Sequence, residues 1–229
     1  MQRTLQLAML EEVRAPEPPI RLSAIFFEPG SAPQVAEELL SLGDVVVAVG
    51  APLSVPREGP PGRESDALLL RRGVRPQPPH PEAQRLVEHL SELPVFTPGD
   101  PDHQEGGVSE GSYHDFPLFE TSADGVFYAL QGRRLPAKRH PFGMRMRIDE
   151  LAGEGVIDES GDLWQRRIEE LDALACALSA HRYAVGHASW LGDSDEGVVV
   201  LPGTGLPATF PVEGVLPPVE RLQLPPERA

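Results

Sequence analysis

The chain has 229 residues, which is enough for one large domain or two small ones with a buried core. Its net charge is −15 and 40% of its residues are hydrophobic, as expected for a globular protein rather than a disordered chain. No apolar run reaches the roughly 20 residues of a membrane helix, and the single cysteine excludes an internal disulfide. We therefore expect a cytoplasmic protein without a membrane partner. Its acidity disfavours binding nucleic acid over its whole surface.

The first 50 residues predict the beginning of a sheet. Apolar segments over 4–10 and 20–28 flank a proline-rich turn and predict an antiparallel hairpin. Residues 31–42 follow as a helix, with Ser31 as its N-cap and Pro33 in its first turn. The run DVVVAV over 44–49 is continuously apolar, which predicts a buried central strand.

The remaining elements predict an α/β fold. Helices are expected over 64–72, 81–90, 123–130, 141–151 and 162–185, and strands over 116–121 and 197–201. A polar, glycine-rich loop is expected over 97–114, and proline-rich residues 202–229 form a tail. We predict a single domain over 1–201, with a central mixed β-sheet and helices on both faces. The tail over 202–229 is expected to pack on its surface.

One segment has the opposite charge to the rest. From 125 to 148 the sequence has no acidic residue and carries six cations, which leaves −21 for the remainder. They are Arg133, Arg134, Lys138, Arg139, Arg145 and Arg147. A solvated basic helix face would explain this segment. A patch that binds phosphate groups is the functional alternative.

Two carboxylates occupy unusual positions. Asp172 sits beside the apolar stripe of the helix over 162–185, where aspartate is a poor helix former. It either faces solvent, pairs with an arginine such as Arg166 or Arg167, or binds a metal. Glu120 ends an apolar strand, a usual place for ligand sites in α/β sheets, although such a residue is often only part of a loop. Together the two carboxylates would suit Mg²⁺ or Mn²⁺.

Other catalytic motifs are missing from the sequence. The histidines have no zinc-binding spacing, and neither a P-loop, a G-x-G-x-x-G motif nor a G-x-S-x-G elbow occurs. Cys176 lies among small residues that favour helix packing, which is a poor context for a nucleophile.

Three segments together resemble a known family. They are VVVAVGAPLSVP (45–56), the stretch around Glu120 with KRHPFGMRMRIDEL (138–151), and LDALACALSAHRYAVG (171–186) with EGVVVLP (196–202). In order and spacing, roughly residues 44–202 resemble the family called domain of unknown function 429, a group of predicted nucleases with an RNase H-like fold. The resemblance implies that fold and a two-metal site. It places the family's acidic residues on Glu120 and Asp172, and its Lys/Arg pair on Lys138 and Arg139.

Two acidic positions of the family are absent. The family opens with a Gly-Val-Asp strand that carries a metal ligand, whereas TLQLAML contains no aspartate. A second aspartate of the family falls on Gly50, which cannot bind a metal. We therefore expect an RNase H-like protein with weak or lost catalysis, a pseudoenzyme without cofactor.

The expected ligand is a nucleic acid or nucleotide, held by Arg134, Lys138, Arg139 and Arg145. The alternative is an active nuclease or phosphodiesterase that uses Mg²⁺ or Mn²⁺ on Glu120 and Asp172. The sequence leaves open whether the chain forms a homodimer.

Overall fold

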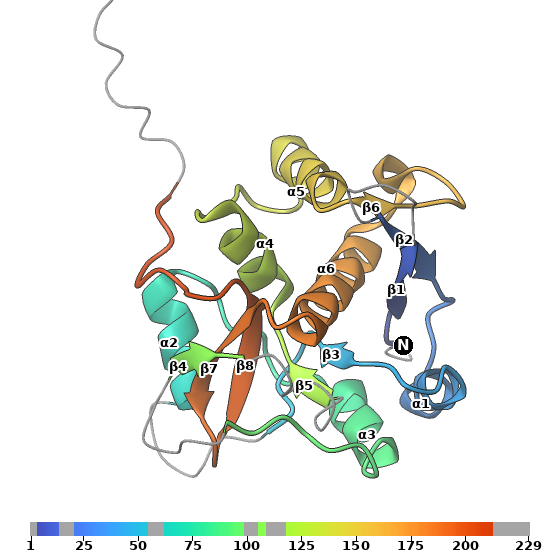
Figure 1. Ribbon diagram of the computed structural model, residues 1–229, viewed down its shortest axis with the longest axis horizontal. Coiled ribbons are helices and arrows are strands. Elements are labelled where there is room, and N and C mark those ends of the chain that lie inside the picture. Colours follow the sequence, from blue (N-terminus) through green and yellow to red (C-terminus); the bar gives the residue numbers. More distant parts are fainter. Residues whose placement is uncertain (1–3, 14–20, 55–61, 99–104, 109–117, 213–229) are drawn as a thin grey trace, which may run out of the picture.

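The computed structural model describes residues 4–13, 21–54, 62–98, 105–108 and 118–212, which form a mixed α/β fold (Figure 1). Its smaller sheet has the order β1-β2-β6, from β1 (Ala8–Val13), β2 (Arg21–Phe26) and β6 (Val156–Ile157). β1 and β2 form the predicted antiparallel hairpin, and β6 lies parallel to β2.

A second sheet has five strands in the order β3-β5-β8-β7-β4. They are β3 (Val47–Val49), β5 (Leu118–Glu120), β8 (Gly197–Pro202), β7 (Ala188–Asp193) and β4 (Glu105–Gly107). β3, β5 and β8 are parallel, whereas β7 is antiparallel to both of its neighbours. The described strands thus form two sheets where the sequence predicts one central sheet. β3 lies at a sheet edge, so the central position predicted for 44–49 is wrong for the described strands.

In the described part of the chain six α-helices surround the sheets, and each corresponds to a predicted helix. They are α1 (Ala32–Ser41), α2 (Glu64–Arg72), α3 (Pro81–His89), α4 (Ala123–Gln131), α5 (Pro141–Gly153) and α6 (Ile168–Ala184). Ser31 is the N-cap of α1, as predicted, and its N–H donates to the Gln34 side chain at 2.9 Å. None of the described helices is long and apolar enough to cross a membrane.

The long helix begins later than its apolar pattern predicts. Asp162 caps a short 3₁₀ helix (Leu163–Gln165) instead, because its side chain accepts a hydrogen bond from Trp164 N–H. Arg166 then adopts an extended backbone, and its guanidinium binds Asp158 at 2.6 and 3.0 Å. This ion pair holds the chain in a turn, so α6 starts at Ile168.

β3 is covered by helices on both faces. Val47 and Val49 pack in a cluster with α1 and α3, whereas Val46 and Ala48 pack against a cluster that contains Ala180 and Tyr183 of α6. Because side chains alternate along a strand, α1 and α3 cover one face of β3 and α6 covers the other. α6 also packs against β1, so this helix is shared by the two sheets (Figure 1).

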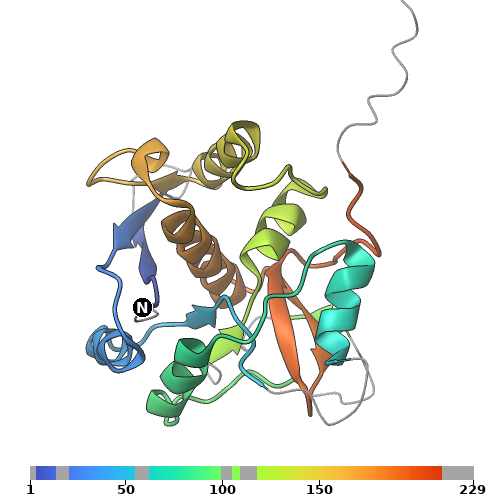
Figure 2. The ribbon, with the colours of Figure 1, turned by 180° about the vertical axis from the view of Figure 1, so that it is seen from behind.

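α2 packs against β7 and β8, on the side of the molecule seen in Figure 2. The chain beyond β8 returns to this helix: Phe210 is fully buried and its N–H donates to the Arg72 carbonyl at 3.0 Å. The predicted tail therefore begins with an anchored segment. Residues 213–229 of that prediction lie outside the described part of the chain.

Candidate functional site

Glu120 ends β5 and is bound to an arginine that the sequence analysis did not single out. The Arg63 guanidinium donates to Glu120 Oε2 at 2.5 Å and to Oε1 at 2.7 Å. Leu53 N–H donates to Oε2 at 3.0 Å. Glu120 is 5% exposed and Arg63 is 1% exposed. Both carboxylate oxygens are therefore engaged inside the protein.

Arg63 reaches this position because it is the N-cap of α2. Its guanidinium also binds Asp66 one turn further along, at 2.9 and 3.2 Å, and Ser54 Oγ at 3.2 Å. The Arg-x-x-Asp spacing was visible in the sequence. The contact with Glu120 was not, because it joins residues 57 positions apart.

Burial and pairing oppose each other in this cluster. Desolvation raises the pKa of Glu120 more than the hydrogen bonds from Arg63 and Leu53 lower it. Desolvation also acts against the charge of Arg63, but its hydrogen bonds to Glu120 and Asp66 outweigh that effect and raise its pKa. Because arginine keeps its proton, Glu120 faces a permanent positive charge.

Asp172 lies on α6 and pairs with Lys138 from the connection between α4 and α5. Its Oδ2 accepts from Lys138 Nζ, whereas its buried Oδ1 has no hydrogen-bond partner among the described residues. Desolvation raises the pKa of this carboxyl, and Lys138 opposes the shift. The structure thus joins a predicted catalytic acid to a predicted phosphate-binding lysine.

Gly50 faces α6 immediately after β3. A Cβ atom built on Gly50 would lie 2.8 Å from Cys176 Sγ, so a side chain at this position would require the Cys176 thiol to shift. Gly50, Asp172 and Cys176 line one cavity, whereas Glu120 is not among its lining residues. The structure therefore brings two of the sequence-predicted positions to one cavity and leaves Glu120 in a different buried cluster.

Of the basic segment over 125–148, Lys138, Arg145 and Arg147 are paired with acids. Arg147 is buried and binds Asp124 at 2.8 Å, and the exposed Arg145 pairs with Asp149 at 3.4 Å. Arg139 is exposed and forms no ion pair within the described part of the chain.

Arg134 lies at the other end of this segment, where its backbone bridges to Val212. Its Nε is buried and has no hydrogen-bond partner among the described residues. Of the predicted phosphate-binding residues, Arg139 is thus the one that is exposed and forms no ion pair among the described residues.

The arrangement does not fit a bound divalent metal. Glu120 is held by Arg63 and Asp172 by Lys138, so each carboxylate already has a cation of the chain as its partner. Among the residues that the structure describes, no three His, Cys, Asp or Glu side chains are grouped so that they could hold a metal ion. We therefore derive no chemical step through a metal.

Comparisons with known proteins add no relative: no family model, no curated protein and no solved structure matches this chain.

Proposed function

We propose that this chain is an RNase H-like protein of the predicted-nuclease family whose catalysis is lost or strongly weakened, and that it binds phosphate-bearing ligands through a basic patch. The observation that carries the proposal is the Arg63–Glu120 pair. A carboxylate whose two oxygens both bind a buried guanidinium already has its charge compensated by that cation, which disfavours a metal ion at the same group.

The RNase H-like assignment has two kinds of support. The resemblance of residues 44–202 implies it. The described topology supports its α/β class, because parallel strands β3, β5 and β8 stand beside antiparallel β7 and are covered by helices. Gly50 occupies the position where the family carries an aspartate, and a Cβ atom there would lie only 2.8 Å from Cys176 Sγ, which supports the loss of catalysis.

The phosphate-binding part of the proposal rests on Arg139, Lys138 and the exposed Arg145. Lys138 is 30% exposed and bound to Asp172, so a phosphate group would have to compete with that carboxylate. Arg139 lies next to it in the sequence and needs to break no ion pair of the described chain. We therefore expect Arg139 to make the largest single contribution to phosphate binding.

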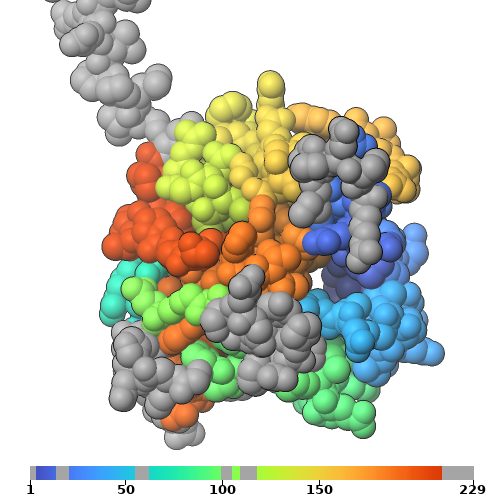
Figure 3. Space-filling view, in the orientation of Figure 1, coloured from blue at the N-terminus to red at the C-terminus, as the bar shows by residue number. Residues whose placement is uncertain are grey.

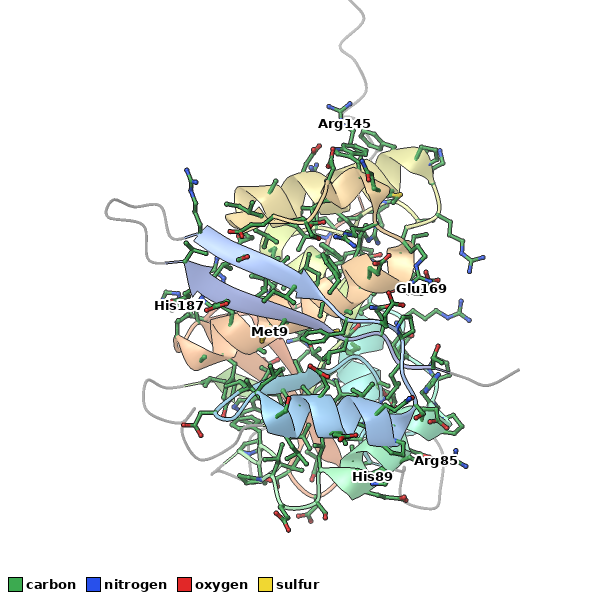
Figure 4. The ribbon with its side chains drawn as sticks, turned by 90° about the vertical axis from the view of Figure 1, so that its right-hand side faces the viewer. Met9, Arg85, His89, Arg145, Glu169 and His187 are labelled. Atoms are coloured by element: carbon green, nitrogen blue, oxygen red, sulfur yellow. The ribbon has the colours of Figure 1, made fainter. Side chains whose placement is uncertain are left out.

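Binding is tested with fluorescein-labelled single- and double-stranded oligonucleotides of DNA and RNA, by anisotropy over a range of salt concentrations. We expect affinity to fall with salt, and Arg139→Glu to weaken binding and reduce the salt slope by about one. Arg85→Glu is the matched control, because exposed Arg85 lies on α3 at the opposite end of the molecule from Arg145 (Figure 4). Equal effects of the two variants, or no binding by the wild type, would refute the basic patch.

Catalysis is tested separately with the same oligonucleotides and Mn²⁺. We expect no cleavage above the level of Asp172→Asn. Mn²⁺-dependent cleavage by the wild type that Asp172→Asn abolishes would favour the alternative, an active nuclease that uses Glu120 and Asp172.

A further inference from the structure

A cavity lined by described residues lies between the two sheets and is not used by the proposed function. Its volume is about 660 Å³, in the range of ligand pockets. β1, β3, α1 and α6 enclose it. In the space-filling view, the surface is open between α6 in orange, β1 in dark blue and the light-blue region of β3 and α1 (Figure 3). We call this cavity the slot.

Two walls of the slot are strand edges. Seven consecutive residues, 4–10, form one wall, and eight consecutive residues, 44–51, form the other. Successive side chains of a strand point to opposite faces, so one face alone would contribute only every second residue. Uninterrupted runs mean that the backbone edges of β1 and β3 face the slot.

Both edges lack a neighbouring strand in the described part of the chain. β1 is the terminal strand of the smaller sheet, and β3 is the terminal strand of the larger one. Leu5 exchanges two backbone hydrogen bonds with Gly30, and the Leu7 carbonyl accepts from Phe27 N–H, both on the side of β2. The amides of the alternate residues, Gln6 and Ala8, therefore point the other way, into the slot.

The same argument applies to β3. The Val49 carbonyl accepts from Thr121 N–H, and Val47 to Val49 pair with β5. Val49 thus directs its backbone groups to β5, whereas those of Ala48 and Gly50 point into the slot.

The slot lies in the plane of a sheet. Leu5 and Leu7 pack with the α1 and α3 cluster, and Ala8 and Leu10 pack with the cluster that contains α6. The side chains of β3 alternate in the same way between the α1 and α3 cluster on one face and α6 on the other. The slot therefore has helices above and below it and a strand edge on each side. This is the environment of a central strand, for which the apolar run over 44–49 is also typical.

The charges around the slot are acidic. Asp44 and Glu169 line it, together with Asp172, which is bound to Lys138, and with His80 and His181; no lysine or arginine is among the described lining residues. Glu169 lies at the beginning of α6 (Figure 4). An occupant should therefore be apolar along its length and carry basic groups at its ends.

We propose that the slot takes one further β-strand: an extended polypeptide segment from outside these 229 residues, apolar on both faces, which pairs with β1 and β3 and joins the two sheets. Within the chain, the longest proline-free runs outside the described part are SEGSYHDF (109–116) and VERLQL (219–224). Half or more of the residues in each run are polar, whereas the occupant must be apolar on both faces. This mode of recognition is β-augmentation, with a partner edge on both sides.

The test uses the full chain and a capped eight-residue peptide, six valine and isoleucine residues with one arginine at each end. We expect saturable one-to-one binding by calorimetry, and slower amide hydrogen exchange at Gln6, Ala8, Ala48 and Gly50. A peptide with two successive N-methylated amides keeps its apolar surface but loses a donor toward each edge. We expect it to bind at least about tenfold more weakly.

The site is checked with Ala177→Phe, which fills the slot from α6, and with Leu40→Phe as matched control. Leu40 lies on α1, is 53% exposed and does not line the slot. Only Ala177→Phe should abolish peptide binding, with both variants folded by circular dichroism.

Four outcomes would overturn the proposal. They are no binding by the folded wild type, equal binding of both peptides, laurate binding without peptide binding, and a homodimer that Ala177→Phe converts to a monomer. The last two would assign the slot to an aliphatic ligand or to a second copy of the chain.

Discussion

The substitution Arg63→Met tests the Arg63–Glu120 pair most directly. Methionine retains an apolar side chain of similar length but removes both bonds to Glu120, whose carboxylate is 5% exposed. Removing one partner from a buried ion pair leaves the other charge uncompensated, and this costs about 3–5 kcal/mol of the free energy of unfolding. The backbone capping by Arg63 is retained, because its carbonyl still accepts from the N–H groups of Asp66 and Ala67. The variant also loses the bonds to Asp66 and Ser54, but Asp66 is 24% exposed, so we attribute most of the loss to buried Glu120.

The loss should depend on pH with a defined sign. Burial already raises the pKa of Glu120, and without Arg63 nothing of comparable strength lowers it. The folded pKa then lies above the unfolded value of about 4.3. A carboxyl of this kind stabilises the fold below the unfolded pKa, and the contribution disappears as pH rises through the folded pKa. Arg63→Met should thus be more destabilised, relative to wild type, at pH 8 than at pH 5.

Urea denaturation followed by circular dichroism at both pH values measures this effect. The double variant Arg63→Met/Glu120→Gln is the control, because a neutral amide cannot titrate. We expect it to recover part of the loss at pH 8 and to remove the added pH dependence. A loss below about 1 kcal/mol at pH 8, equal at pH 5, would show that the pair does not hold a buried charge.

Three further predictions concern other parts of the molecule. Gly50→Ala should lower the free energy of unfolding by about 1–3 kcal/mol through overpacking on Cys176. Adding Cys176→Ala should restore this stability, and denaturation curves without such a recovery would contradict the contact. Asp158→Asn should cost roughly 2 kcal/mol at pH 7. Desolvation raises the pKa of Asp158, but the bonds from Arg166 and Ser160 outweigh it and lower that pKa, so this contribution disappears as pH falls through the folded value. An equal cost at pH 2.5 and pH 7 would exclude this linkage. Burial raises the pKa of Cys176 to about 12, so a thiol reagent at pH 8 should label this residue only after denaturation. Rapid labelling of the native protein would contradict this prediction.

The sequence predicted the helices well, because their signals are local. α2 begins and ends at the predicted residues, where Arg63 precedes it and Gly73 terminates it with a positive φ of 82°. The start of α6 was missed, because the bond between Arg166 and Asp158 joins residues eight positions apart, a spacing that helix start signals do not include. Residues 188–193 and 105–107 were not predicted as strands, since ASWLGD and EGG lack a regular apolar pattern.

The candidate site was less accessible to sequence reasoning. Glu120 and Asp172 were identified as unusual acids, but their partners Arg63 and Lys138 lie 57 and 34 positions away. No local pattern reports such pairs. The apolar run over 44–49 correctly indicated burial between helices, and it gave no sign that one of its edges faces a cavity.

The open edges of β1 and β3 also affect how copies of this chain behave in concentrated solution. An unpaired apolar strand edge is a template for edge-to-edge aggregation. The net charge of −15 makes copies repel each other over about 10 Å at 0.1 M salt, but over only about 3 Å at 1 M. Concentrated salt should therefore promote ordered aggregation of this protein, and a strand bound between β1 and β3 should suppress it.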